Sequence, residues 1–179
     1  MLAIKYDYPF ERFVIETSDS YMLQAFRISG PKHSSPLDIY KPGNSRPAVI
    51  YQHGIFDSAD GFMCLGQDSL AFKLADAGYD VWMVNSRGNR HSLNNRYMDT
   101  NDADFWDFSF QEIAQFDLPA SIHFVLKLTG QKQVSFIGHS LGSSAMFAAL
   151  ATNPELAFYI NVFIALAPLT KITNPDKKI

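Results

Sequence analysis

Short apolar runs alternate with amphipathic segments along this chain. Residues 13–17 and 21–28, separated by three polar residues, predict an antiparallel hairpin. The later apolar runs are continuous, which is typical of parallel strands that are covered on both faces. They lie at residues 48–52, 79–84, 133–137 and 160–167.

Helices are expected between these strands. Ser109 and Glu112 form a capping-box pattern at the start of one of them. Gly130 ends that helix, and Pro119 should kink it because the ring removes a backbone donor. Strands that alternate with helices predict an α/β fold, a mostly parallel sheet with helices on both faces. The three expected helices are residues 69–77, 109–129 and 140–152.

Composition narrows the class of protein. The 179 residues are 47% hydrophobic and 18% charged, which predicts one globular domain with a real core. A net charge of −3 gives no indication of a nucleic-acid partner. The single cysteine, Cys64, excludes an internal disulfide. No apolar run approaches the roughly 20 residues of a bilayer span, so no transmembrane segment is predicted.

One sequence motif indicates a catalytic serine. Gly138, His139, Ser140, Leu141 and Gly142 fit the pattern Gly-x-Ser-x-Gly, directly after an apolar strand and before a helix of small residues. This is the setting of a nucleophile elbow, in which a sharp strained turn exposes the serine. The glycines leave room for neighbouring backbone, and the helix N-terminus places partial positive charge beside the serine. The other interpretation is a tight turn that holds a serine by chance.

A serine nucleophile also needs donors for the oxyanion. The N–H of Leu141 is one natural donor, and the second should come from the loop after an earlier strand. His53 and Gly54 occupy that place after residues 48–52, and the N–H of Ile55 is the candidate donor. Without Ser140, an ordinary strand-ending turn would be the better interpretation of His53 and Gly54.

Over residues 8–169 the chain resembles the acid lipase family of α/β-hydrolases, which includes gastric and lysosomal acid lipases. The resemblance implies an α/β-hydrolase fold and hydrolysis of neutral lipid esters, such as triacylglycerols and cholesteryl esters, with no cofactor. It also implies that Ser140 is the nucleophile. The matching segments are QHGI (52–55), SLAF (69–72), LADAGYDVW (74–82), NSRGN (85–89), FWDFSF (105–110), FDLPA (116–120), TGQKQ (129–133), GHSLG (138–142) and ALAP (165–168).

The sequence departs from the family beyond the elbow. An α/β-hydrolase triad runs in the order Ser, acid, His, but no histidine follows residue 139. We therefore expect residues 1–179 to be the N-terminal part of a single α/β-hydrolase domain, with the lid and the C-terminal strands absent and the sheet incomplete at its C-terminal edge. Three upstream histidines are expected to be structural or solvated rather than general bases; they are His91, His123 and His139.

Residues 160–167 would then leave an open apolar edge. We expect a second chain or a further C-terminal segment to complete the sheet. Two functions stay open: the nucleophile-bearing half of a lipase, or a non-catalytic hydrolase-derived subunit of a larger complex. A thioesterase or acyltransferase is a weaker third interpretation. The resemblance implies a secreted or lysosomal protein, although the sequence holds no signal peptide or glycosylation sequon.

Other features favour structural roles. Arg87 is expected to brace the loop after the strand at 79–84. Four aspartates lack the pattern of a calcium loop, so no metal site is predicted; they are Asp99, Asp102, Asp104 and Asp107. A set of aromatic residues is expected to pack in the core rather than to touch acyl chains: Trp82, Phe105, Trp106, Phe108 and Phe110.

Overall fold

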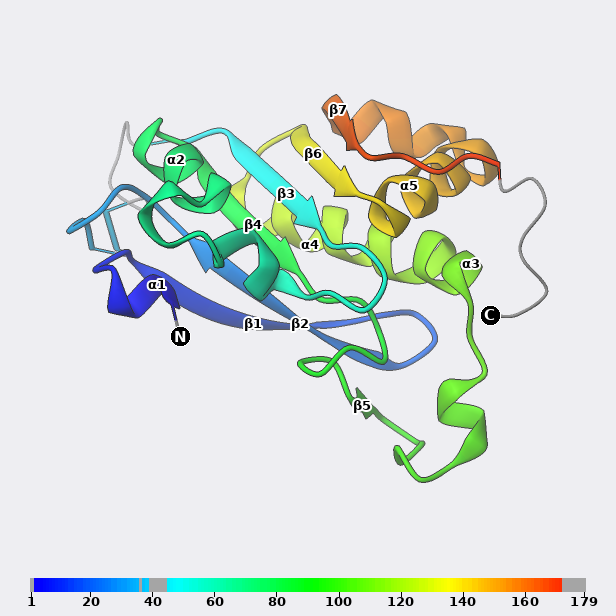
Figure 1. The fold of residues 1–179 in the computed structure, drawn as a ribbon. Helices are drawn as coiled ribbons and strands as arrows, with labels where there is room; N and C mark the ends of the chain where they lie inside the picture. Colours follow the sequence, from blue (N-terminus) through cyan, green and yellow to red (C-terminus); the bar gives the residue numbers. More distant parts are fainter. Residues whose placement is uncertain (1, 36, 39–44, 172–179) are drawn as a thin grey trace.

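The computed structural model describes residues 2–35, 37–38 and 45–171. Its main feature is a sheet with the strand order β1-β2-β4-β3-β6-β7, and a short strand β5 pairs with β2 (Figure 1). The strands are β1 (Phe10–Glu16), β2 (Tyr21–Ile28), β3 (Ala48–Gln52), β4 (Asp80–Val84), β5 (Asn94–Asn95), β6 (Val134–His139) and β7 (Ile160–Leu166).

The direction of the strands confirms the sequence prediction. β1 and β2 form the antiparallel hairpin, and β2 pairs antiparallel with β4. From β4 onwards, β3, β6 and β7 are all parallel. The carboxyl ends of these parallel strands therefore meet at one edge of the sheet, which is where an open α/β sheet places its ligand site.

Helices cover both faces of the sheet, as expected (Figure 1). The short α1 and α2 pack on one face, and α4 and α5 pack on the other. None of the helices in the described ranges is long and apolar enough to cross a bilayer. The helical segments are α1 (Leu2–Lys5), η2 (Ala59–Met63), η3 (Gly66–Asp68), α2 (Leu70–Asp76), η4 (Ala103–Trp106), α3 (Phe110–Glu112), η5 (Ile113–Asp117), α4 (Leu118–Thr129), α5 (Leu141–Thr152) and η6 (Pro154–Tyr159).

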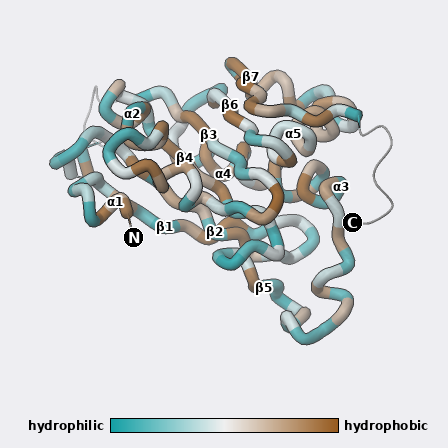
Figure 2. Tube along the Cα trace, viewed as in Figure 1, coloured by the Kyte–Doolittle hydropathy of each residue, from teal (hydrophilic) through white to brown (hydrophobic). Residues whose placement is uncertain are grey.

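The central strands are buried on both faces, which explains their continuous apolar runs. Ile50 and Trp82 belong to the core beneath α4 and α5, whereas Val49 and Val81 belong to the core beneath α2. Alternate residues of one strand thus serve two separate cores. Figure 2 shows the hydrophobic residues concentrated along these strands and continuing into β7.

The expected helix at residues 109–129 is interrupted. Its capping box at Ser109 and Glu112 is present, but residues 113–117 form a π-helical turn in which the Leu118 N–H donates to the Ile113 carbonyl. Pro119 comes directly afterwards and has no N–H to donate. The wider turn takes the place of the simple kink that the sequence predicted.

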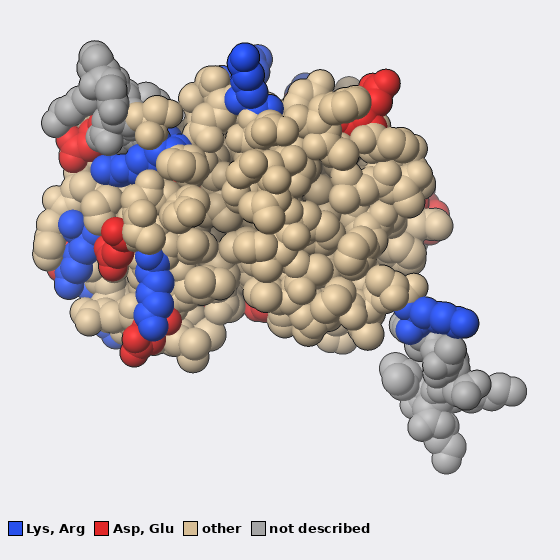
Figure 3. All heavy atoms as spheres, turned by 90° about the horizontal axis from the view of Figure 1, so that it is seen from above, with Lys and Arg blue, Asp and Glu red and all other residues tan. Residues whose placement is uncertain are grey.

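Among the described residues, β7 is the edge strand of the sheet on the side beyond the elbow, as expected. It turns three apolar side chains to the surface on the face shared with α2. The surface around β7 and α5 carries a broad area without charge (Figure 3). The three residues are Val162, Ile164 and Leu166, each 38–44% exposed. We call them the β7 patch.

Candidate active site

The turn between β6 and α5 is strained. Ser140 has φ 50° and ψ −115°, a combination that a non-glycine residue adopts only when its surroundings impose it. The Ser140 N–H donates to the Leu166 carbonyl at 2.8 Å, which ties the turn to the end of β7. α5 begins at the next residue, Leu141, so the first free N–H groups of the helix lie beside the serine.

The two glycines of the motif allow this sharp turn. A Cβ on Gly138 would lie 2.7 Å from the Ser143 nitrogen. A Cβ on Gly142 would lie 2.5 Å from the Gln52 carbonyl oxygen and 2.7 Å from that of His53. Any side chain at either position would therefore push α5 away from the strands on which Ser140 rests.

Ser140 lines a cavity of about 760 Å³. The walls are largely apolar, since Ile55, Phe110, Leu141 and Phe147 all contribute to them. The side chain of Ser140 is half-buried, so its hydroxyl lies at the cavity wall rather than inside the core. Such a cavity suits a small apolar ligand that presents one polar group to the serine.

The loop after β3 lies next to the serine. A Cβ on Gly54 would come within 3.1 Å of the Ser140 Cβ, so this position admits only a very small residue. The following residue, Ile55, lines the same cavity as Ser140. The elbow and the loop that should carry the two expected backbone donors, Leu141 and Ile55, are thus brought together.

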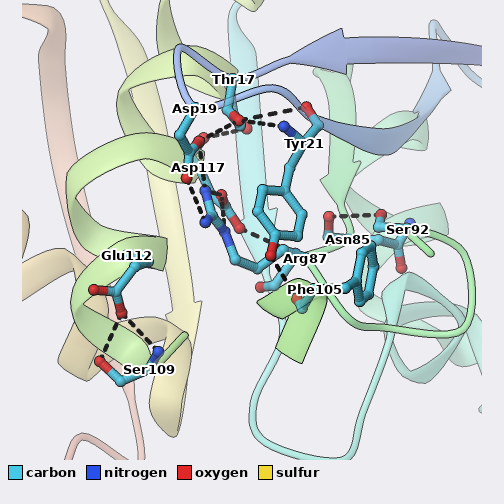
Figure 4. Close-up of polar contacts among 12 residues, drawn as sticks. Thr17, Asp19, Tyr21, Asn85, Arg87, Ser92, Phe105, Ser109, Glu112 and Asp117 are labelled. Atoms are coloured by element: carbon cyan, nitrogen blue, oxygen red, sulfur yellow. Dashed lines mark hydrogen bonds and ion pairs between the residues drawn. The ribbon is translucent and has the colours of Figure 1, made fainter. Parts of the chain in front are cut away.

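Arg87 braces the loop after β4, as the sequence suggested (Figure 4). Its guanidinium is paired with Asp117 at 2.8 Å and with Asp19 at 2.6 Å, and it stacks 4.0 Å from the ring centre of Tyr21. Burial raises the pKa of Asp117 to about 6, although Arg87 opposes this effect. Because Asp19, Arg87 and Asp117 come from three distant segments, these pairs fix the loop against the hairpin and the π-helical turn.

None of the described histidines is hydrogen-bonded to the Ser140 hydroxyl. His139 faces a second cavity, of about 210 Å³, beside Leu166 on the α2 side of the sheet. His123 is exposed and packs edge-on against Tyr159, and His91 pairs with Asp60 at 2.6 Å.

Two of the aromatic residues expected in the core lie elsewhere. Trp106 is 47% exposed and Phe110 is 44% exposed, and Phe110 lines the cavity at Ser140. Their prediction as core residues was wrong because Trp106 ends the short helical segment η4 and Phe110 begins α3, and both side chains lie at the surface there. Trp82 and Phe105 are fully buried, as predicted.

Sequence reasoning also missed residues that the structure places at the site. Phe147, on α5, lines the cavity at Ser140, and its position two helical turns after the serine was an available signal. Asn89 lies in the segment NSRGN, but its role in holding the loop after β3 was not predicted, because its partners His53 and Asp57 are distant along the chain.

Comparison with known proteins identifies the family. Residues 47–158 match the model of the alpha/beta hydrolase fold, and residues 1–66 match that of a partial alpha/beta-hydrolase lipase region. The first match covers more than half of the chain. The chain therefore belongs to the α/β-hydrolase fold family.

Within that family the chain is similar to lipases. It is 46% identical to human gastric triacylglycerol lipase, over 92% of this chain and 40% of the relative. It is 43% identical to human lipase member K, and 43% identical to the lysosomal acid lipase/cholesteryl ester hydrolase of Macaca fascicularis, in both cases over 96% of this chain and 43% of the relative. The chain thus spans 40–43% of the length of these relatives.

Solved structures agree with the fold. An esterase of Pyrococcus furiosus matches with a TM-score of 0.64 at 20% identity, over 94% of this chain and 55% of that one. An epoxide hydrolase of Vigna radiata matches with a TM-score of 0.57 at 16% identity, over 95% and 41% of the two chains. At this level of identity the likeness concerns the fold alone.

Proposed function

We propose that this chain carries the nucleophile and the oxyanion donors of a serine ester hydrolase that acts on neutral lipid esters. The observation that carries the proposal is the strained Ser140, held at the wall of an apolar cavity beside the loop that contains Ile55. The similarity to triacylglycerol and cholesteryl ester lipases supports the substrate class.

In the proposed reaction, the Ser140 oxygen attacks the ester carbonyl carbon while a base takes the serine proton. The carbonyl oxygen becomes an oxyanion, which the N–H groups of Ile55 and Leu141 stabilise; each such donor is typically worth about 3 kcal/mol in the transition state. The proton then passes to the leaving alcohol, and an acyl-enzyme remains. Water attacks the acyl carbon, releases the fatty acid and restores the serine.

The base and its acid partner would come from polypeptide outside residues 1–179, on the same chain or on another. Two observations support this part of the proposal. The Ser140 hydroxyl lacks an imidazole partner among the described residues, and a serine without a base is a weak nucleophile. The β7 patch leaves a parallel edge strand uncovered, whereas such strands are normally covered on both faces.

Labelling with a fluorophosphonate probe tests the proposal. The tagged chain is purified with everything bound to it from the cells that make it. We expect a covalent adduct on Ser140 and no labelling of the Ser140→Ala variant. A native assembly that shows neither ester hydrolysis nor an adduct at Ser140 would contradict the proposal.

The second candidate function is a non-catalytic subunit that uses the uncovered β7 edge to join a larger complex. The same purification, analysed by mass spectrometry, separates the two. Bound polypeptide with the acid and histidine of a hydrolase favours the enzyme, whereas unrelated partners together with an unreactive Ser140 favour the subunit.

A further inference from the structure

The loop after β3 depends on a buried imidazole. His53 is only 6% exposed, and its Nδ1 lies 2.7 Å from the carbonyl oxygen of the next residue, Gly54. Its Nε2 lies 3.1 Å from the backbone nitrogen of Ser86 and 3.1 Å from the Asn89 side-chain nitrogen. The ring thus joins the loop after β3 to the loop after β4.

These partners determine the protonation state of the ring. The Ser86 N–H can only donate, so His53 Nε2 must accept and carries no proton. In a neutral imidazole the proton then lies on Nδ1, which donates to the Gly54 carbonyl. Burial lowers the pKa of His53, which favours this neutral form.

Fixing the Gly54 carbonyl also fixes the next amide. The described residues contain no cis peptide bond, so the carbonyl of Gly54 and the N–H of Ile55 point in opposite directions across one planar unit. The Asp57 N–H also approaches the Gly54 oxygen, at 3.4 Å, and Asn89 donates to the Asp57 carbonyl at 3.0 Å. The carbonyl is therefore held on the protein side, and the N–H is turned away from it.

We propose that His53 is a positioning residue, whose Nδ1–H holds the Gly54–Ile55 peptide so that the Ile55 N–H serves as an oxyanion donor. Asn89 acts with it by holding both the ring and the Asp57 carbonyl. The inference rests on the proposed function, because an oxyanion arises only if Ser140 is acylated.

Two substitutions at one position test it. In His53→Asn the amide nitrogen takes the place of Nδ1 and can still donate to the Gly54 carbonyl. In His53→Gln the amide reaches the place of Nε2 and leaves that carbonyl without its donor. We expect kcat for a short-chain p-nitrophenyl ester to fall roughly 100-fold or more in His53→Gln with KM changed less than about twofold, and to fall less than about tenfold in His53→Asn. His123→Gln, at an exposed histidine, is the matched control and should leave both constants unchanged.

Measurements on the native assembly distinguish failure of the proposed function from failure of the positioning role of His53. If the unmodified assembly neither hydrolyses the ester nor labels at Ser140, the proposed function fails. If it is active but the two His53 variants have the same activity as each other, the positioning role is wrong. It is also wrong if the substitutions raise KM rather than lower kcat. Should His53→Gln fail to fold, ¹⁵N spectra of the unmodified imidazole decide: protonated Nδ1 and unprotonated Nε2 at neutral pH support the role, and the opposite tautomer or an imidazolium overturns it.

Discussion

The Cα of Gly142 lies against the carbonyl oxygen of Gln52, so close that a Cβ would stand 2.5 Å from that oxygen. This contact seats the first turn of α5 on the end of β3 and thereby places Ser140 next to Gly54. The elbow is therefore defined by two strands and one helix together, and not by the five-residue motif alone.

Gly142→Ala tests this contact. In an unobstructed helix interior, alanine stabilises relative to glycine by roughly 0.5–1 kcal/mol. Here the added methyl group must displace backbone, and we expect a loss of about 1–3 kcal/mol in the free energy of unfolding. Denaturant unfolding measures the difference, and a stabilised variant would contradict the described contact.

Arg87→Met should destabilise the protein because it leaves the buried carboxylate of Asp117 without its positively charged partner, although the backbone N–H of residue 87 still donates to it. We expect a loss of about 3–5 kcal/mol in the free energy of unfolding, and a partial recovery in the double variant Arg87→Met/Asp117→Asn. Arg96→Met is the matched control, since its pair with Glu16 is exposed and should contribute little. If Arg87→Met and Arg96→Met lower the free energy of unfolding equally, burial does not increase the contribution of the Arg87–Asp117 pair.

Stability should depend on pH through His53. Its pKa is lowered in the folded protein, so below about pH 6.5 the unfolded chain binds a proton that the folded protein resists. The free energy of unfolding should therefore fall as the pH drops, by up to about 1.4 kcal/mol per pH unit from this one group. Denaturant unfolding between about pH 7.5 and about pH 5 should show a shallower fall in His53→Asn. An identical slope in the two proteins would mean that His53 is not held neutral.

The β7 patch should bind the polypeptide that completes the sheet. A carboxylate introduced by Ile164→Glu lies on the exposed face of β7 and would be buried without a partner in the assembly. We expect this variant to remain folded but to lose its bound polypeptide in pull-down experiments. Val14→Glu, on the edge strand at the opposite side of the sheet, is the control and should retain it.

Much of the fold could be predicted from local patterns. The strand at residues 48–52 has the predicted bounds. A continuous apolar run between a proline and a histidine–glycine pair is too short for a buried helix, so a strand is the structure that fits it. The helix after Ser140 begins only one residue later than expected. The capping box at Ser109 is present because its two side chains need only local partners.

The features that the sequence did not predict depend on distant partners. The π-helical turn lies just before Pro119, whose missing N–H predicts a disturbance of the helix there but not the form that the disturbance takes. The sequence indicated that Arg87 braces a loop, but not that it forms ion pairs with Asp19 and Asp117. These partners could not be predicted because they lie in a hairpin and a helix that are distant from Arg87 along the chain. The contacts of Asn89 with His53 and with the Asp57 carbonyl were not predicted either, since both partners are distant along the chain.

Acylation of Ser140 is the chemical step on which the proposed function depends. The native assembly is mixed with p-nitrophenyl butyrate, quenched in acid within the first turnover and digested, and the peptide that contains residue 140 is weighed. We expect a butyryl group on Ser140 of the unmodified assembly, and neither that group nor turnover in Ser140→Ala. Ester hydrolysis that persists in Ser140→Ala, or an assembly whose Ser140 peptide never carries the acyl group, would contradict it.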